Sequence, residues 1–344
     1  MAKFPKNLWY VAAWSHEVGE GLFSRTILSE PILLFRQADG TAVAIGDTCP
    51  HRFAPLHKGK LVDGKVECPY HGLQFDGTGT CVHNPHGDHK IPSAARVKHY
   101  PVVERDTLLW VWPGDPALAD PSKIPDFNIL NDTTTYTHTK GAVISMNIAF
   151  DLILDNLMDL THAAYLHLDN LGSEAVKRGK MNVVQEGNNL TTQNWWPNGL
   201  PAPVFPMTGA CSPDNPVDYW VDVHWKPLGV MFFDAGITPT GRPKSEGVEL
   251  NSAQILTPET EHSTHYFWRM FRNYQKENAE LTAGIEVAVK QAFQSQDEAM
   301  IEEVAERMDG HDLWDLNPVL LATDTAAVRV RRILQQLNET EMHA

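Results

Sequence analysis

C-P-H-R at residues 49–52 and C-P-Y-H-G at residues 68–72 are the two stretches that decide the fold of this chain. They offer two thiolates and two imidazoles, from Cys49, Cys68, His51 and His71. This donor set suits a [2Fe–2S] cluster with two cysteines on one iron and two histidines on the other, a type with a higher reduction potential than all-cysteine plant-type clusters. The neighbouring prolines and glycines predict tight loops whose backbone N–H groups can point at the cluster sulfurs.

The same cysteines and histidines could instead form a disulfide or a zinc site. A disulfide between Cys49 and Cys68 is disfavoured, because the N-terminal stretch M-A-K-F-P-K-N-L-W-Y-V-A-A-W lacks a charged-then-apolar signal pattern and a reducing compartment is expected. Zinc takes the same residue types, but its sites usually space their ligands as C-x2-C or H-x3-H. The remaining cysteines, Cys81 and Cys211, have no assigned role and are expected to be ordinary free thiols.

The composition is that of an ordinary globular protein. The chain has 344 residues, enough for two domains, with 42% hydrophobic and 21% charged residues. No stretch approaches the roughly 18–20 apolar residues of a membrane span, so no membrane is expected. A net charge of −15 argues against nucleic acid as a partner, because its phosphates would repel the chain. A cytoplasmic protein is expected.

The fold prediction is α+β, in two domains. The first 115 residues contain many short apolar runs separated by turns, including hairpins around Ala38–Gly40 and Gly77–Gly79. We therefore expect a small antiparallel β domain over residues 1–125, with the cluster loops at one end. The proline-rich stretch G-D-P-A-L-A-D-P-S-K-I-P at 114–125 predicts the boundary.

Residues 126–344 predict a catalytic domain with an antiparallel sheet flanked by helices. The expected strands lie at 219–225, 230–237 and 263–271, and the expected helices at 150–166, 277–308 and 323–338. A [2Fe–2S] cluster alone transfers electrons and performs no substrate chemistry, so this larger domain needs a site of its own.

A second metal site is indicated by N-L-M-D-L-T-H at 156–162, followed by His167. Two histidines and one carboxylate on one face of a metal form the facial triad of non-haem Fe(II) oxygenases, which leaves positions open for O2 and substrate. His162 and His167 are about 140° apart around an ideal helix, so the helix should end or bulge between Ala163 and Leu166 if both bind one iron. Two unrelated helix histidines are the other interpretation.

Helical periodicity indicates which carboxylate could complete the facial triad. Along 277–308 an apolar stripe contains Leu281, Ile285, Val289, Phe293, Met300, Val304 and Met308. Asp297 falls on this stripe, and a carboxylate on a buried face is costly unless it is paired or bound to a metal. Asp297 is therefore the candidate third ligand, with an ion pair to a buried arginine as the alternative.

Together these motifs resemble the oxygenase component of the Rieske non-haem iron oxygenases, and most closely the vanillate and dicamba O-demethylase group. Supporting stretches are N-L-W-Y-V-A-A-W at 7–14, V-W-P-G-D-P-A at 111–117 and I-L-T-P-E-T at 255–260. The resemblance covers nearly the whole chain. It implies that His162, His167 and Asp297 are the ligands of a mononuclear iron.

The resemblance also implies how electrons reach that iron. Asp159 would hydrogen-bond His162, with which it would share a helix face, and would accept a bond from His71 of a neighbouring subunit. Because the cluster and the iron of one subunit lie too far apart for electron transfer in this family, a head-to-tail homotrimer is expected. Asn156 would lie near the iron without binding it.

The expected reaction takes electrons from NAD(P)H through a separate reductase or ferredoxin, because the chain has no G-x-G-x-x-G fingerprint. The iron centre would hydroxylate a C–H bond with O2, and a hydroxylated methyl ether collapses to a phenol and formaldehyde. Candidate pocket residues are Trp195, Trp196, Met231, Phe232, Phe233, Gln254 and Trp268. Family members that act on aromatic carboxylates need polar or cationic groups here, so these residues predict an uncharged aromatic ether or N-alkyl substrate.

Three alternatives share parts of this pattern. A Rieske ferredoxin would be about a third as long and would lack the 156–167 segment. A ring-hydroxylating dioxygenase would share both iron sites but is usually longer and pairs with a β subunit. An idle homologue would have lost a ligand, whereas all seven are present. Both demethylation and simple hydroxylation stay open as the reaction.

Overall fold

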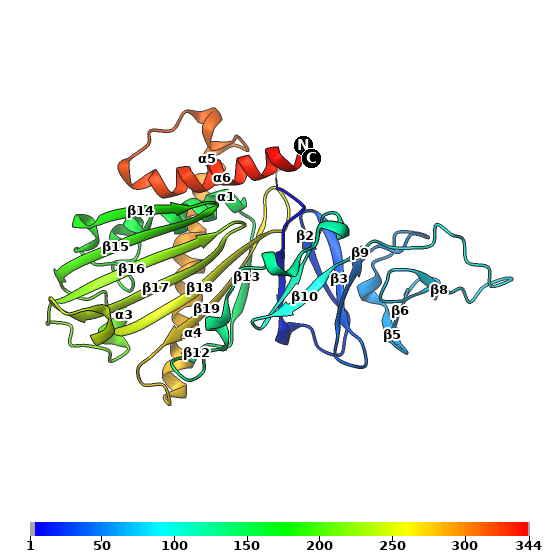
Figure 1. Cartoon of the computed structure of the whole chain (residues 1–344), viewed down its shortest axis with the longest axis horizontal. Coiled ribbons are helices and arrows are strands. Elements are labelled where there is room, and N and C mark those ends of the chain that lie inside the picture. Colours follow the sequence, from blue (N-terminus) through cyan, green and yellow to red (C-terminus); the bar gives the residue numbers. More distant parts are fainter. Residues whose placement is uncertain (1–3, 343–344) are drawn as a thin grey trace. The chain divides into compact units, whose positions relative to one another are not determined.

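The structure is a computed structural model that describes residues 4–342 (Figure 1). The chain divides into two compact units. Of the described residues, the first unit runs to Asn131 and includes Thr257–Glu261 and residues 340–342, and the second comprises Asp132–Leu256 and His262–Glu339. The predicted domain boundary after residue 125 stays a prediction. Within residues 4–342, no helix combines the length and the apolar character that a membrane crossing needs.

The first unit contains three small antiparallel sheets. Their strands are β1 (Tyr10–Trp14), β2 (Phe23–Ile27), β3 (Glu30–Arg36), β4 (Ala42–Gly46), β5 (Lys60–Val62), β6 (Lys65–Glu67), β7 (Gln74–Phe75), β8 (Cys81–His83), β9 (His99–Tyr100), β10 (Val102–Arg105) and β11 (Leu108–Val111). The strand orders are β1-β11-β10, β2-β3-β4-β9 and β5-β6-β7-β8. Both predicted hairpins are confirmed, as β3–β4 and β7–β8.

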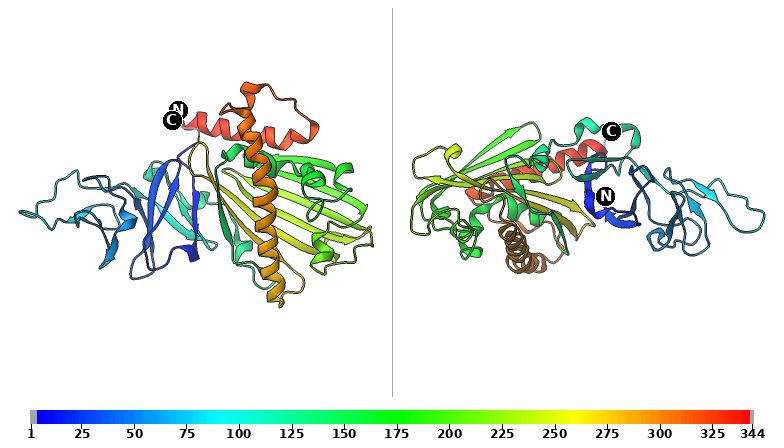
Figure 2. Two further views of the ribbon diagram at one scale, coloured as in Figure 1. Left: turned by 180° about the vertical axis from the view of Figure 1, so that it is seen from behind. Right: turned by 90° about the horizontal axis from the view of Figure 1, so that it is seen from below.

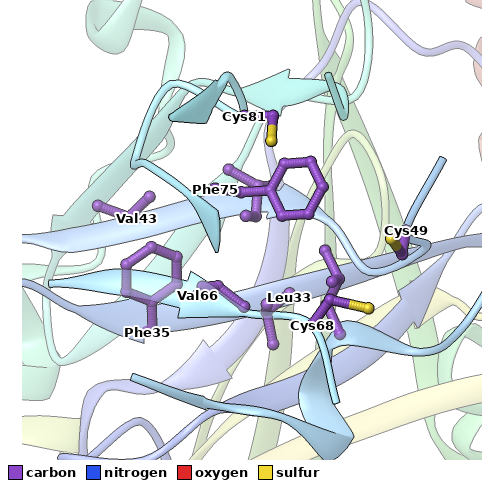
Figure 3. Packing of buried hydrophobic residues seen from close by; sticks show 10 residues of the cluster. Leu33, Phe35, Val43, Cys49, Val66, Cys68, Phe75 and Cys81 are labelled. Atoms are coloured by element: carbon purple, nitrogen blue, oxygen red, sulfur yellow. The ribbon is translucent and has the colours of Figure 1, made fainter. Parts of the chain in front are cut away.

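A hydrophobic core joins two of these sheets. Leu33, Phe35 and Val43 of β3 and β4 pack with Val66 and Phe75 of β6 and β7, and all five are buried. Figure 3 shows the cysteines of the C-P-H and C-P-Y-H stretches at one margin of this core, away from Phe35 and Val43. Burying apolar side chains is the main stabilising contribution in so small a unit, so the core holds the two cysteine loops in place.

The second unit is built on one large antiparallel sheet. Its strands are β12 (Thr137–His138), β13 (Ala142–Met146), β14 (Lys180–Glu186), β15 (Asn189–Gly199), β16 (Val217–Lys226), β17 (Val230–Pro239), β18 (Val248–Pro258) and β19 (Thr264–Arg272). The order is β12-β19-β18-β17-β16-β15-β14, with β13 also paired to β19. The three predicted strands are confirmed, and so is the α+β class with an antiparallel sheet flanked by helices.

The helix expected over 150–166 is wrong as a single element. α1 (Phe150–Met158) ends before Asp159, a 3₁₀ turn follows at Leu160–His162, and α2 (Ala163–Leu166) comes last. Asp159 has extended backbone angles, and its side chain accepts a hydrogen bond from the Thr161 N–H. Because this is the bond of a helix N-cap, Asp159 ends one helix and starts the next turn.

The long helix expected over 277–308 contains a wide turn. It consists of α4 (Ala279–Ala292), a π-helical turn (Phe293–Glu298) and α5 (Ala299–Met308). Figure 2 shows α4 lying across one face of the sheet. The predicted stripe is wrong at Met300 and Val304, which are exposed, and Ile301 is buried instead. A π turn holds more residues than an α turn, so it shifts the buried positions by one and keeps Asp297 facing inward.

The terminal helix expected over 323–338 forms α6 (Thr325–Met342). Its Arg331 is buried and binds two acids of α1, with Nη1 at 2.9 Å from Asp151 and Nη2 at 2.6 Å from Asp155. Burial would lower the pKa of Arg331, but the two carboxylates outweigh it and raise the pKa. The three charges therefore fix α1, which carries Asn156, against α6.

We expect Arg331→Leu to lower the free energy of unfolding by about 3–5 kcal/mol, because it leaves two carboxylates without their cation in a poorly hydrated position. Urea unfolding followed by circular dichroism measures this loss. Arg332→Leu is the matched control, since Arg332 is exposed on the same helix and should change stability by no more than about 0.5 kcal/mol. Equal effects of the two variants would contradict the structural role of Arg331.

Candidate metal centres

Three metal-binding side chains of the second unit meet at one point. His162 ends the 3₁₀ turn, His167 follows α2, and Asp297 lies in the π turn. One ligand atom from each lies within 4.8 Å of the others. The Asp297 Oδ1 is 2.9 Å from Nε2 of His167 and 3.6 Å from Nε2 of His162. The structure thus brings together the two histidines and the carboxylate proposed from sequence.

The local backbone explains how two histidines five residues apart face the same point. α2 ends at Leu166, within the interval expected from sequence, and His167 has left the helical conformation. Gly172 then donates its N–H to the His167 carbonyl at 2.8 Å. A Cβ at Gly172 would lie 1.9 Å from the Ala163 carbonyl oxygen, so only glycine allows this close return of the chain.

Both imidazoles present Nε2 to this point because Nδ1 of each is already used. The Nδ1–H of His162 donates to the Asp159 backbone carbonyl at 2.6 Å, and that of His167 donates to Gln296 Oε1 at 2.8 Å. Such outer partners fix the tautomer and the ring orientation of metal-binding histidines. Gln296 had no sequence signal of its own beyond its place next to Asp297.

The expected hydrogen bond between Asp159 and His162 is confirmed, but its acceptor is the backbone carbonyl of Asp159 and not the carboxylate. That carboxylate accepts from the Thr161 N–H at 2.9 Å and from the Thr161 hydroxyl at 2.7 Å. The expected shared helix face of Asp159 and His162 is wrong, since Asp159 lies at the break between two helices. The backbone carbonyl supplies the contact to His162 because the carboxylate serves as the cap.

Gln296→Leu should weaken iron binding by about 10- to 100-fold, because His167 loses the acceptor that orients its ring. Gln296→Glu keeps an acceptor there and should retain the iron. The rate of iron transfer to a chelator, followed by absorbance, measures the difference. Gln294→Leu is the control, because Gln294 is exposed in the same turn. Iron loss at the same rate from the Gln296→Leu and Gln294→Leu variants would contradict a role for Gln296.

The electrostatics of the three groups suit a cation. Burial lowers the pKa of His162, which favours its neutral, metal-binding form. Burial also acts to lower the pKa of His167, but the hydrogen bond and the charge of Asp297 outweigh it and raise that pKa. Asp297 is 6% exposed and receives a hydrogen bond from Asn156 Nδ2 at 3.2 Å.

The alternative of an ion pair between Asp297 and a buried arginine is wrong for the part of the chain that the structure describes, where the ionisable partners of Asp297 are the two histidines. A buried carboxylate beside two imidazoles, without arginine or lysine, is costly unless a cation joins them. Nitrogen and oxygen donors in this 2-His-1-carboxylate arrangement fit non-haem iron.

The three groups open onto a partly enclosed cavity in the second unit. Its walls are mostly apolar and include Leu157, Leu160, Phe205, Leu250, Met270 and Phe293. Asn156, Ser252 and Gln254 add polar groups, and no arginine or lysine of the described residues lines it. An apolar cavity with a few polar groups suits a small organic molecule.

The structure places only some of the expected pocket residues on this cavity. Phe233, Gln254 and Trp196 line it, whereas Trp195 and Met231 do not. Phe232 is also outside the lining, because neighbouring residues of a strand point to opposite faces, and its ring lies beside Phe271 and His224. Trp268 is fully buried behind Phe293, at 6.0 Å between ring centroids, and does not reach the cavity.

The two cysteine loops of the first unit share one hydrogen-bond pattern. Cys49 N–H donates to the Ala54 carbonyl, and the Phe53 N–H donates back to Cys49. Likewise, Cys68 N–H donates to Leu73 and the Gly72 N–H donates back to Cys68. The fifth residue of each loop has a positive φ, 57° at Phe53 and 70° at Gly72. The two loops are therefore equivalent turns.

These turns bring like donors together. Cys49 and Cys68 are buried free thiols, so the structure has no disulfide between them, and the rings of His51 and His71 lie 4.5 Å apart between centroids. Burial raises the pKa of the Cys49 thiol to about 11, so a cation is needed to hold its thiolate. A pair of thiols and a separate pair of imidazoles fit the two differently bound irons of a Rieske cluster. Cys81 lies in the core.

Comparison with known proteins agrees with the two metal sites found in the structure. Residues 8–101 match the Rieske [2Fe–2S] domain, and residues 146–340 match the vanillate O-demethylase oxygenase C-terminal domain. The oxygenase component of dicamba O-demethylase from Stenotrophomonas maltophilia is 41% identical over 98% of this chain and 99% of its own length. The oxygenase component of chloroacetanilide N-alkylformylase from Rhizorhabdus wittichii is 39% identical over 96% of this chain and 95% of its own length.

A crystal structure of dicamba monooxygenase bound to dicamba matches with a TM-score of 0.91 at 40% identity, covering 98% of this chain and 99% of the other. A further dicamba monooxygenase structure contains non-haem iron. The cofactors of this chain are thus a Rieske [2Fe–2S] cluster and a mononuclear iron, and a separate protein supplies its electrons. The chain belongs to the Rieske non-haem iron oxygenases, as an oxygenase component of the vanillate and dicamba O-demethylase group.

Proposed function

We propose that this oxygenase removes an alkyl group, as an aldehyde, from an oxygen or nitrogen atom of a small, neutral aromatic compound. For a methyl ether, R–O–CH3, O2, two electrons and two protons give R–O–CH2OH and water. The hemiacetal then breaks its O–CH2 bond to give the phenol R–OH and formaldehyde. The observation that carries this proposal is an iron-binding triad open to an apolar cavity that no lysine or arginine of the described residues lines.

In this proposal His162, His167 and Asp297 hold the iron, and Cys49, His51, Cys68 and His71 hold the cluster. The iron, when bound, supplies the activation of O2. The chain supplies the surroundings: Asn156 donates to the Asp297 carboxylate, and the apolar walls exclude water from the site. Such walls also hold the aromatic ring in place by burial, so the protein controls position while the metal performs the oxidation.

The charge of the cavity lining favours a neutral substrate. A carboxylate placed in an apolar cavity loses its hydration and needs a cationic partner in exchange. The lining offers only neutral donors apart from the metal ligands. Among the relatives, one acts on chloroacetanilides, which are neutral amides, so the family accommodates uncharged substrates.

We further propose that electrons enter the iron site from the cluster of a neighbouring subunit, through His71 and Asp159, in a head-to-tail homotrimer. Exposed aromatic rings flank the cluster ligands, with Phe53 77% and Tyr70 64% exposed. On the second unit, Tyr165 is 73% exposed within the His162–His167 segment. Large exposed apolar groups beside both sites are typical of surfaces that become covered in an assembly. Phe53 even holds a strained, left-handed backbone where the equivalent loop has Gly72.

The test is a single turnover. The protein is reduced without O2, mixed with a panel of uncharged methoxyarenes, exposed to O2 and assayed for formaldehyde. We expect formaldehyde together with the matching phenol, and acetaldehyde from ethoxyarenes. Products that carry a new hydroxyl group and keep the alkyl group would instead identify a ring- or methyl-hydroxylating oxygenase. Release of no oxidised product from any arene that binds would contradict the proposal.

A further inference from the structure

We infer that Ser252 and Gln254, which Tyr266 holds in place, form a binding site for a neutral carbonyl oxygen of the substrate, such as that of an aryl amide. This inference rests on the proposed dealkylation of a neutral aromatic and names the group that such a substrate carries. It follows from the hydrogen-bonding capacity that Ser252 and Gln254 leave unused inside the cavity.

The three residues come from adjacent strands and are nearly inaccessible. Ser252 and Gln254 lie two apart on β18, so they point to the same face of the sheet, and both line the cavity. Tyr266 on β19 lies behind them. The exposed fractions are 5%, 4% and 2% for Ser252, Gln254 and Tyr266. Phe233, which pairs with Ser252 across the strands, keeps this part of the wall apolar.

A chain of hydrogen bonds runs through the three side chains. The Tyr266 hydroxyl donates to Gln254 Oε1, and Gln254 Nε2 donates to Ser252 Oγ at 2.9 Å. Burial raises the pKa of Tyr266 well above its usual value, so its hydroxyl stays protonated and donates. Reversing the Gln254 amide would leave the Tyr266 proton without an acceptor in a fully buried position, which fixes the direction of the chain.

Two donors remain at the cavity end of this chain. Ser252 Oγ already accepts from Gln254, so its own proton must be donated elsewhere, and the Gln254 amide has a second N–H. Within residues 4–342 neither proton has a further acceptor. A buried donor without an acceptor costs free energy. A ligand that accepts from it removes that cost, and this strengthens binding.

A carbonyl oxygen is the acceptor that matches. It has two lone pairs and can accept from both Ser252 and Gln254. It carries no net charge, whereas a carboxylate would have no cation from the described lining residues to pair with. The same cavity contains His162, His167 and Asp297, so a substrate anchored at Ser252 is held in the space where the iron acts.

The test uses three probes of nearly equal shape: methoxybenzamide, methoxybenzoate and methoxytoluene, each as its 2- and 3-methoxy isomers. Affinity for the iron-loaded, cluster-loaded protein is measured by titration calorimetry. We expect the better-bound amide isomer to bind about tenfold more tightly than its toluene analogue, which has no acceptor, and than its benzoate analogue.

Variants distinguish the loss of each donor from a general loss of folding. Ser252→Ala and Gln254→Leu should each abolish the preference for the amide over methoxytoluene, whereas Ser252→Thr keeps a hydroxyl and should preserve most of the preference. Ser212→Ala, an exposed position, is the control. Iron content also reports whether each variant is folded.

The inference is overturned if methoxybenzoate binds best, or if the Ser252→Ala and Gln254→Leu variants keep the preference for the amide. Formaldehyde from methoxytoluene without any preference for the amide would overturn this inference and leave the proposed function standing. If the amide is preferred and its loss follows Ser252 and Gln254, but no probe yields formaldehyde, the carbonyl site stands and the proposed dealkylation does not.

Discussion

Asp297→Ala is expected to lower the iron content from about three atoms per chain to about two, the number held by the Rieske cluster. Turnover should fall by more than about a hundredfold, because even outer-shell partners of a metal change affinity or activity by 10- to 100-fold. The reason is the arrangement around Asp297: its Oδ1 faces Nε2 of both His162 and His167, and two imidazoles alone leave the metal with too few donors.

Iron is counted colorimetrically, and the cluster is followed separately by its visible absorbance and electron paramagnetic resonance, which should not change. Glu306→Ala is the matched control, because Glu306 is an exposed carboxylate on α5, which directly follows the π turn. An unchanged iron content and normal turnover in the Asp297→Ala variant would rule out Asp297 as a ligand.

Asp159→Asn is expected to leave the cluster and the mononuclear iron in place and still reduce steady-state turnover by about a hundredfold or more. Asparagine keeps an oxygen that can accept from Thr161, so the cap that ends α1 and starts the 3₁₀ turn is preserved. The backbone carbonyl that orients His162 is also preserved. What is lost is the negative charge that would accept a hydrogen bond from the partner subunit's His71.

The informative measurement compares two rates. Reduction of the cluster by an external donor should be normal in the Asp159→Asn variant, whereas reoxidation of the reduced cluster by O2 and substrate should be slow. Thr161→Val is the control, since it removes one partner of the Asp159 carboxylate and keeps the charge. Cluster reoxidation at the normal rate in the Asp159→Asn variant would contradict the proposed path between subunits.

Much of the candidate site was visible in the sequence, because metal ligands are rare residue types in fixed positions. The two Cys-His stretches, the pair His162 and His167, and Asp297 on an apolar stripe could each be found by spacing. The break at Asp159 could not, since L-M-D-L-T-H has no proline or glycine, and the helix ends there only because the Asp159 side chain caps the next turn. The π turn could not be predicted either, because its residues favour an ordinary α-helix.

Strand periodicity sets a different limit. It shows that Phe232 and Phe233 face opposite sides of a sheet, but not which side carries the cavity, and both sides of β17 bear apolar residues. Trp268 shares the apolar character of a pocket residue and is nevertheless covered by Phe293. Gln296 and Ser252 are ordinary polar residues in sequence, and only the hydrogen bonds to His167 and from Gln254 give them a role.

The central claim is that substrate is oxidised at His162, His167 and Asp297 with electrons from the Rieske cluster. It is tested most directly by reducing both centres without O2, adding O2 and a methoxyarene that the protein binds, and recording cluster reoxidation and formaldehyde together. We predict that the two appear at the same rate in the wild-type protein, and that His167→Ala, with the cluster intact, gives neither at an appreciable rate. Formaldehyde release at the wild-type rate from the His167→Ala variant would contradict the account.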